Sequence, residues 1–339
     1  MRARRSLIKK RIWIGCLLIA SVISTGCNQQ NAAAATPKSE HASEQNSGAK
    51  DSAIKGADSS GSAKSSDAVA LRDSTPVVLQ PEAPGTNTIG NEKASIDISN
   101  ITKGYIVVSY KGNNEKVRFQ VQYESEDPYT YRLNSFEDAV FPLTRGDGSY
   151  KFTVYENVSG DEYATAFEGK SEVTLENEFL PFLYPNQYVK YDQNTQAVAL
   201  GQKLVKEATD DLDALAKIYD YVVGNIDYDY DKAENVASGY LPVIDQVLDE
   251  KKGICFDYAA VMTCMLRTQR IPTQLVVGYS GTVYHAWISV YIDGVGWIHD
   301  IIRFDGKEWV RMDPTLASTN KKAEKTVENS GNYRAMYYY

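Results

Sequence analysis

The stretch Gly253-Ile254-Cys255-Phe256-Asp257-Tyr258-Ala259-Ala260 determines how the rest of the chain is interpreted. A glycine here precedes a cysteine that begins an almost entirely apolar segment, residues 255–267. A helix that is apolar on every side is buried, so Cys255 is predicted in the first turn of a buried helix. The free amides and the positive end of such a helix favour a thiolate, and the same amides could bind an oxyanion. Cys255 is therefore a candidate nucleophile, and a buried inert thiol is the alternative.

The cysteine content supports this interpretation. Cys16 and Cys27 lie in the first 27 residues, and only Cys255 and Cys264 remain in the body of the chain. Nine positions on one helix span about 13 Å of axis and half a rotation, which is beyond the reach of a disulfide. Cys264 would face the opposite side and is predicted as a core residue. Two thiols that cannot pair need another reason to be present, and reactivity is one.

Two later segments carry side chains that could activate the thiol. Residues 284–292 alternate as a strand that places His285 and Trp287 on one face. Residues 308–313 are predicted as another strand, which ends at Asp313. A histidine on one strand and an aspartate on another can meet across a sheet. The imidazole would then take the thiol proton, and the carboxylate would orient the imidazole.

Three motifs occur in order: Gly253-Ile254-Cys255-Phe256-Asp257-Tyr258-Ala259, Tyr284-His285-Ala286-Trp287 and Met312-Asp313-Pro314-Thr315. Together they resemble the transglutaminase-like superfamily of papain-type Cys-His-Asp thiol enzymes, over roughly residues 200–317. The resemblance implies an α+β fold in which the nucleophile helix packs on an antiparallel sheet. It also implies acyl transfer or hydrolysis at peptide or amide carbonyls through a Cys-linked thioester, resolved by an amine or by water. No cofactor is expected, and the sequence does not separate a protease from a crosslinking transferase.

The resemblance assigns roles, and the spacing departs from compact family members. Cys255 would be the nucleophile, His285 the general base and then acid, and Asp313 the group that orients the imidazole. Twenty-seven residues separate His285 from Asp313, and a strict meander would leave a strand between them. Residues 297–304 are therefore expected to detour. Asp300 is the alternative for the third position.

Further site residues are predicted as contacts to the substrate or its oxyanion. These are Phe256, Tyr228 and Trp287, with Asn225 as another candidate oxyanion donor. No calcium-site pattern like that of animal transglutaminases is found.

No metal site is predicted. Residues 227–231 alternate aspartate with tyrosine, but they lack the glycine and the closing glutamate of a calcium loop. They are predicted as a half-buried strand. A zinc site is disfavoured because the cysteines and histidines lack Cys-x-x-Cys pairing. His299 lacks the Ala-Trp flank of His285 and is predicted as an ordinary sheet histidine.

The N-terminus predicts export. Residues 1–11 carry six Lys/Arg and no acid, and residues 12–23 are apolar but too few to span a membrane. Ser24-Thr25-Gly26-Cys27 resembles the lipobox of bacterial lipoproteins, in which Cys27 would be lipidated. Plain secretion is the alternative for this export signal, residues 1–27.

Three further segments follow. Residues 28–90, rich in Ser, Ala and Gly, are predicted as a disordered linker, because they bury too little apolar area to offset ordering entropy. Residues 91–178 alternate with period two between turn signals and predict an antiparallel β-sandwich. Arg145-Gly146-Asp147 is interpreted as one of these turns. Residues 185–339 would form the transglutaminase-like domain.

Within that last domain, the spacing predicts helices over 195–208 and 211–223, and an extended segment over 225–231. Leu241-Pro242 is expected to open a short helix with proline in its first position. Residues 332–339 are predicted as a last strand.

The charge balance constrains partners. The net charge is −8, and removing residues 1–26 leaves 30 basic and 44 acidic residues, or −14. This argues against nucleic acid and against an electrostatic membrane contact. A lipid on Cys27 would be the membrane anchor, on the extracellular face, with surface peptides or proteins as substrates. The rival function is a non-catalytic surface binding or scaffolding protein that uses the β-sandwich and retains the fold.

Overall fold

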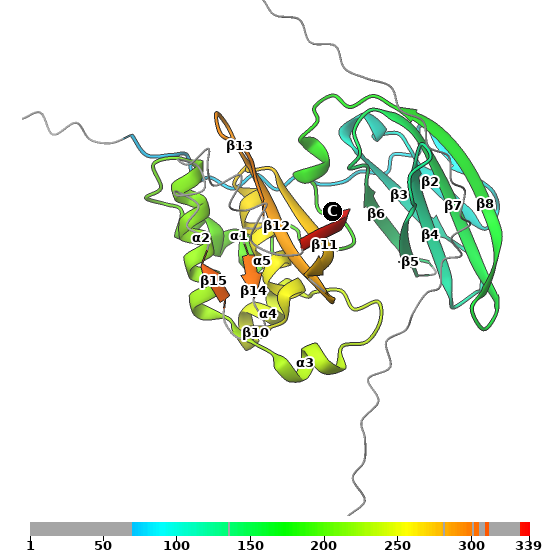
Figure 1. Cartoon of the computed structure of the whole chain (residues 1–339). Helices are drawn as coiled ribbons and strands as arrows, with labels where there is room; N and C mark the ends of the chain where they lie inside the picture. Colours follow the sequence, from blue (N-terminus) through cyan, green and yellow to red (C-terminus); the bar gives the residue numbers. More distant parts are fainter. Residues whose placement is uncertain (1–69, 135, 281, 300–301, 305–308, 312–332) are drawn as a thin grey trace, which may run out of the picture. The chain divides into compact units, whose positions relative to one another are not determined.

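The computed structural model describes residues 70–339 except 135, 281, 300–301, 305–308 and 312–332 (Figure 1). All described residues belong to one unit of the chain, residues 65–339. Asp313, its alternative Asp300 and the lipidation candidate Cys27 lie outside the described residues. In the part that is described, no helix is both long and apolar enough to cross a membrane.

Two four-stranded antiparallel sheets occupy residues 88–173. One has the order β1 (Thr88–Gly90), β2 (Ala94–Asp97), β3 (Tyr105–Tyr110) and β6 (Asp138–Pro142). The other has the order β5 (Tyr129–Leu133), β4 (Val117–Tyr123), β7 (Gly148–Ser159) and β8 (Glu162–Val173). The apolar faces meet where Phe119 of β4 packs on Phe141 of β6, with ring centroids 4.7 Å apart.

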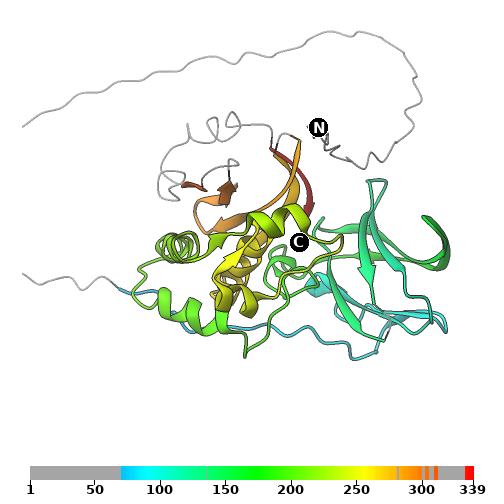
Figure 2. The same ribbon diagram turned by 90° about the horizontal axis from the view of Figure 1, so that it is seen from below.

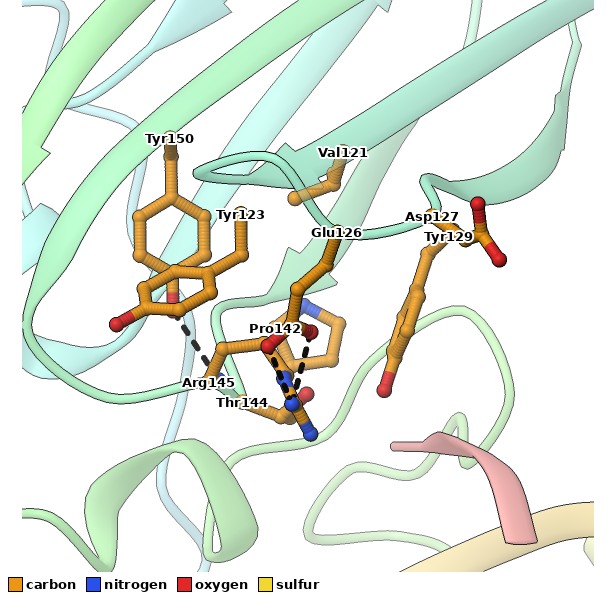
Figure 3. Close-up of a pocket in the computed structure, with 9 residues that line it drawn as sticks. All are labelled: Val121, Tyr123, Glu126, Asp127, Tyr129, Pro142, Thr144, Arg145 and Tyr150. Atoms are coloured by element: carbon orange, nitrogen blue, oxygen red, sulfur yellow. Dashed lines mark hydrogen bonds and ion pairs between the residues drawn. The ribbon is translucent and has the colours of Figure 1, made fainter. Parts of the chain in front are cut away.

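The Arg145-Gly146-Asp147 tripeptide is a turn, as predicted. Gly146 has a φ of 83°, which favours glycine. The Tyr150 hydroxyl accepts from the Arg145 amide at 3.1 Å and donates to the Gly146 carbonyl at 2.9 Å, while the Arg145 guanidinium pairs with Glu126 at 2.7 Å (Figure 3). The pocket beside this turn holds about 10 Å³, which is room for one water and for no ligand.

The helices of the C-terminal half surround α5 (Cys255–Thr268), whose residues from Asp257 onward are all buried. Helices α1 (Gln196–Leu204) and α2 (Asp211–Asn225) lie on one side of α5, and strands β11 (Thr273–Ser280) and β12 (Val283–Ile292) lie on the other (Figures 1 and 2). Asp210 caps α2 by accepting from the Asp213 amide at 2.8 Å. The predicted buried helix and both preceding helices are therefore confirmed.

Two local expectations in this half are wrong. The extended segment predicted over 225–231 is short: β9 (Asp227–Tyr228) is followed at once by α3 (Tyr230–Asn235), because the Asp229 side chain caps α3 by accepting from the Lys232 amide at 3.0 Å. Pro242 does not open a helix, since α4 (Ile244–Glu250) begins two residues later with Val243 as its N-cap.

The sheet that α5 packs on has the order β13-β12-β11-β16 and is antiparallel. Its strands are β11 (Thr273–Ser280), β12 (Val283–Ile292), β13 (Gly296–Ile298) and β16 (Tyr333–Tyr338). Strands β14 (Ile302–Phe304) and β15 (Trp309–Arg311) pair separately. The segment 297–304 thus divides between two sheets, as the expected detour requires, and the predicted last strand is confirmed as β16.

Residues 70–87 form an extended segment, although the composition places them in the predicted linker. The Arg72 guanidinium binds Asp211 and also donates to the Gln269 side chain at 3.0 Å. The Val77 amide donates to the Thr268 carbonyl at 2.8 Å. Polar contacts hold this segment together with the partly buried Val78 and Leu79, and composition does not reveal such contacts.

Arg267 joins several parts of the chain from inside α5. Its fully buried guanidinium donates to the carbonyls of Thr273 at 2.8 Å, Tyr184 at 2.6 Å and Tyr339 at 2.7 Å. Burial lowers the pKa of Arg267 to about 10, so the guanidinium stays charged at neutral pH. Main-chain oxygens rather than a side-chain carboxylate satisfy this buried charge.

Candidate active site

The chain reaches Cys255 through a tightly packed turn. Strand β10 (Lys252–Gly253) pairs in parallel with β9, which places Gly253 opposite Tyr228. A Cβ atom on Gly253 would lie 2.7 Å from the Cβ of Asp257, so no larger residue fits without a shift. Ile254 is the N-cap of α5, and Cys255 is its first residue. The cysteine therefore lies where the sequence predicts it.

Three backbone amides act on the thiol of Cys255. The N–H groups of Ala286, Phe256 and Cys255 itself all lower the thiol pKa. Burial has the larger effect and, together with the negative charge of Asp257, raises the pKa of Cys255 to about 11. The expectation that the helix start would lower this pKa is wrong, because desolvation of the thiolate outweighs the amides.

The Ala286 amide, which lowers the pKa of the thiol, belongs to the residue that follows His285. His285 lies on β12 opposite Gly278 of β11 and is only 6% exposed. Burial lowers the pKa of His285 to about 4, so the imidazole is neutral at physiological pH. The contact between the thiol and His285 stays a prediction, and Asp313 lies outside the described residues.

Trp287 lies near His285, and the pKa of Tyr228 responds to Cys255. The Trp287 ring is 6.1 Å from the His285 ring, centroid to centroid, at an interplanar angle of 23°. Tyr228 lies opposite Gly253, and burial, followed by the charge of Cys255, raises the pKa of Tyr228 to about 12. Asn225 is used elsewhere, because its side-chain amide donates to the Tyr221 carbonyl at 2.8 Å.

Phe256 takes part in an aromatic cluster. Its ring centroid is 5.7 Å from that of Tyr188 and 6.3 Å from that of Tyr240. Tyr188 in turn stacks on Tyr339, with centroids 3.9 Å apart and an interplanar angle of 5°. The residue after the cysteine is thereby held by contacts from two distant parts of the chain, one of which packs on Tyr339.

Asp257 is a site residue that sequence reasoning missed. Its carboxylate is fully buried, and Oδ2 accepts from the Ile254 amide at 2.8 Å and from Lys232 Nζ at 2.7 Å. Oδ1 accepts from the Tyr240 hydroxyl at 2.5 Å. An acid at the third position of a helix is a capping signal, so the contact of Asp257 with the Ile254 amide could have been predicted from the sequence. Nothing in the sequence indicates that Lys232 and Tyr240 contact Asp257.

A comparison with known families supports this geometry. Residues 198–314 match the model of the transglutaminase-like superfamily. These residues form a transglutaminase-like domain. The matched range contains the α5 cysteine and the β12 histidine, and it supports a thiol enzyme at the level of the family.

Individual relatives of the transglutaminase-like domain are distant. The UPF0252 protein MJ1282 of Methanocaldococcus jannaschii is 31% identical over 128 residues, which is 34% of this chain and 33% of that protein. The chain thus spans about a third of that relative. A candidate cysteine protease from Cytophaga hutchinsonii is 15% identical with a TM-score of 0.32, over 75% of this chain and 81% of that one. Red sea bream transglutaminase is 11% identical with a TM-score of 0.27, over 62% and 48%.

The remaining polar candidates of the transglutaminase-like domain have structural partners. Cys264 is fully buried in the core, as predicted. His299 follows β13, and its Nδ1 lies 3.1 Å from the Ser289 hydroxyl. Asp229 caps α3 and pairs with Lys252 at 3.1 Å. Among the described residues, no three His, Cys, Asp or Glu side chains are grouped to hold a metal ion.

Proposed function

We propose that this protein is an exported, lipid-anchored thiol enzyme that transfers or hydrolyses acyl groups at peptide or amide carbonyls. The observation that carries the proposal is that the Ala286 backbone amide lowers the pKa of the Cys255 thiol. This effect supports a position of the thiol near the residue that follows His285. Surface or wall-associated peptides are the proposed substrates, on the extracellular face of the membrane, with Cys27 as the lipidated residue.

The chemistry begins from a neutral pair. The Cys255 sulfur attacks the carbonyl carbon while its proton passes to His285, and the carbonyl electrons move to oxygen. Collapse of this intermediate breaks the C–N bond, and the departing amine takes the proton from His285. The resulting thioester is opened by water or by a second amine, which restores the thiol. Asp313 would orient the imidazole.

Neighbouring groups would assist this reaction. The Tyr228 phenol is proposed to donate a hydrogen bond to the oxyanion together with amides at the start of α5. Trp287 and Phe256 would enclose the acyl group. The two N-terminal sheets are proposed to form a β-sandwich over residues 91–178, preceded by a linker that holds the enzyme away from the membrane.

The test offers a glutamine peptide to the purified full-length protein, with and without a fluorescent primary amine. Amine incorporation indicates transfer, and release of acid or of cleaved peptide indicates hydrolysis. Cys255→Ala and His285→Asn should abolish either product, whereas the matched variants Cys264→Ala and His299→Asn should retain it. Activity that survives in Cys255→Ala would refute the proposal.

One observation favours the rival function, a surface binding or scaffolding protein. The pKa of Cys255 is raised to about 11, as expected for an inert buried thiol. In that case the Cys255→Ala variant would retain every cellular phenotype of the wild-type protein, and no acyl product would form with any peptide.

A further inference from the structure

A large groove lies between the second N-terminal sheet and the loop that follows α3. It has a volume of about 760 Å³ and is lined by strands β4 and β5, the β7–β8 turn and residues 238–241. Three basic side chains line it, Lys116, Arg118 and Arg132, against one acidic residue, Asp161. The groove is therefore locally positive in a chain whose net charge is −8.

Two of these cations are held face to face. Arg118 of β4 and Arg132 of β5 are directly opposite each other in the antiparallel register, and both are exposed. Like charges in this arrangement destabilise a sheet. Within the described part of the chain, neither arginine has a carboxylate within ion-pair distance, whereas Arg145 of the same half pairs with Glu126. Such a pair of guanidinium groups suits an anionic ligand.

Both guanidinium groups are positioned rather than loose. The Arg118 guanidinium carbon lies over the Tyr163 ring, 4.1 Å from its centroid. Arg132 lies against the loop after α3, residues 238–241. A Cβ added to Gly239 in this loop would be 3.4 Å from Arg132 Nη1. Gly239 itself has a φ of 82°, which favours glycine. Ordering these side chains in advance lowers the entropy cost of binding.

Two residues of the groove wall also contact the start of α5. Tyr240 lines the groove and also donates to Asp257, two residues after Cys255. Tyr188 lines it as well and packs on Phe256, the residue next to the cysteine. A peptide lying in the groove would therefore contact side chains that themselves pack on the start of α5.

We infer that this groove binds an acidic stretch of the substrate peptide, with carboxylates on Arg118 and Arg132, and so selects acidic peptides for the thiol. The inference rests on the proposed function for the reaction itself. The charge-assisted contacts make binding sensitive to salt.

Binding is tested without turnover, in the full-length Cys255→Ala protein. The probe is a fluorescent glutamate-rich peptide, compared with the same peptide carrying glutamine at every glutamate. We expect Arg118→Gln/Arg132→Gln to weaken the glutamate peptide by roughly tenfold or more and to leave the glutamine peptide unchanged. The matched control is Lys203→Gln/Lys206→Gln, which removes the same charge from exposed positions elsewhere and should change neither.

Equal weakening by the two double variants would overturn the inference, because net charge alone would then explain binding. Arginine-dependent binding of inorganic polyphosphate without binding of the glutamate peptide would overturn it too. In the active protein, the arginine variant should raise KM for the acidic donor and leave kcat unchanged. If the peptide binds but the wild-type protein forms no acyl product, the proposed function is rejected and the inference that the groove binds acidic peptides stands.

Discussion

The Tyr240 hydroxyl donates a hydrogen bond of 2.5 Å to Oδ1 of Asp257. This bond ties the loop after α3 to the helix that begins at Cys255. Lys232 reaches the other carboxylate oxygen at 2.7 Å and also lies over the Tyr240 ring, 4.4 Å from its centroid. The Asp257 carboxylate, the Tyr240 phenol and the Lys232 ammonium group thus hold the start of the helix in one place.

Removing this buried carboxylate should destabilise the fold. Asp257→Ala is expected to lower the free energy of unfolding by about 3 kcal/mol, because Lys232 loses its counter-ion and the Ile254 amide its acceptor. Urea unfolding of the full-length protein measures this. The matched variant is Asp213→Ala, since Asp213 also pairs with a lysine near a helix start but is more exposed. It should cost about 1 kcal/mol, and equal losses would contradict the assignment.

A second prediction concerns the glycine before the cysteine. Gly253→Ala should destabilise the protein by about 1–3 kcal/mol and displace Cys255, because the added methyl would meet Asp257 at 2.7 Å. Gly224 in α2 has open space around its missing Cβ, so Gly224→Ala should stabilise by about 0.5 kcal/mol. Thermal unfolding of both variants checks the opposite signs, and two shifts of the same sign would reject the steric argument.

The reactivity of the thiol should follow its raised pKa. With a pKa of about 11, Cys255 is expected to react with iodoacetamide more slowly than free cysteine at pH 7. The rate should rise about tenfold per pH unit towards pH 10. Mass spectrometry of the alkylated peptides gives the rate for Cys255 and for buried Cys264 as the internal control. A rate that levels off near pH 7 would show a lower pKa in solution.

Stability should depend on pH through His285. Its pKa is about 4 in the folded protein and about 6.5 in an unfolded chain. Between these values the unfolded state binds the proton and the folded state does not. The free energy of unfolding should therefore fall by on the order of 2 kcal/mol as the pH drops from 6.5 to 4. This contribution should disappear in His285→Gln and remain in His299→Gln. The measurement is the free energy of unfolding against pH for the wild-type protein and both variants, and three parallel curves would contradict the prediction.

Much of the candidate site followed from periodicity. The apolar run after Cys255 and the alternation around His285 specify a buried helix and a strand, and both form with the expected faces. Ala286, Ile288 and Val290 join the core against α5. Hydrophobic pattern sufficed here because burial alone decides these elements.

Other features depend on contacts that a single sequence does not encode locally. The pairing of Arg118 with Arg132 follows from strand register, and the Lys232 contact to Asp257 spans 25 positions. The raised pKa of Cys255 reflects how deeply the thiol is buried, which helix position alone does not give. The prediction that Pro242 opens a helix was wrong because a proline that fits a first turn also fits an extended loop.

The buried Arg267 has a consequence for dissecting the chain. A fragment that starts at residue 185, where the sequence pattern changes, would delete the Tyr184 carbonyl that accepts from this guanidinium at 2.6 Å. It would also delete Arg72 and its contacts to Asp211 and Gln269. An excised C-terminal half would thus carry a buried cation short of one acceptor and an uncovered helix end. A soluble fragment for biochemistry should begin near residue 70.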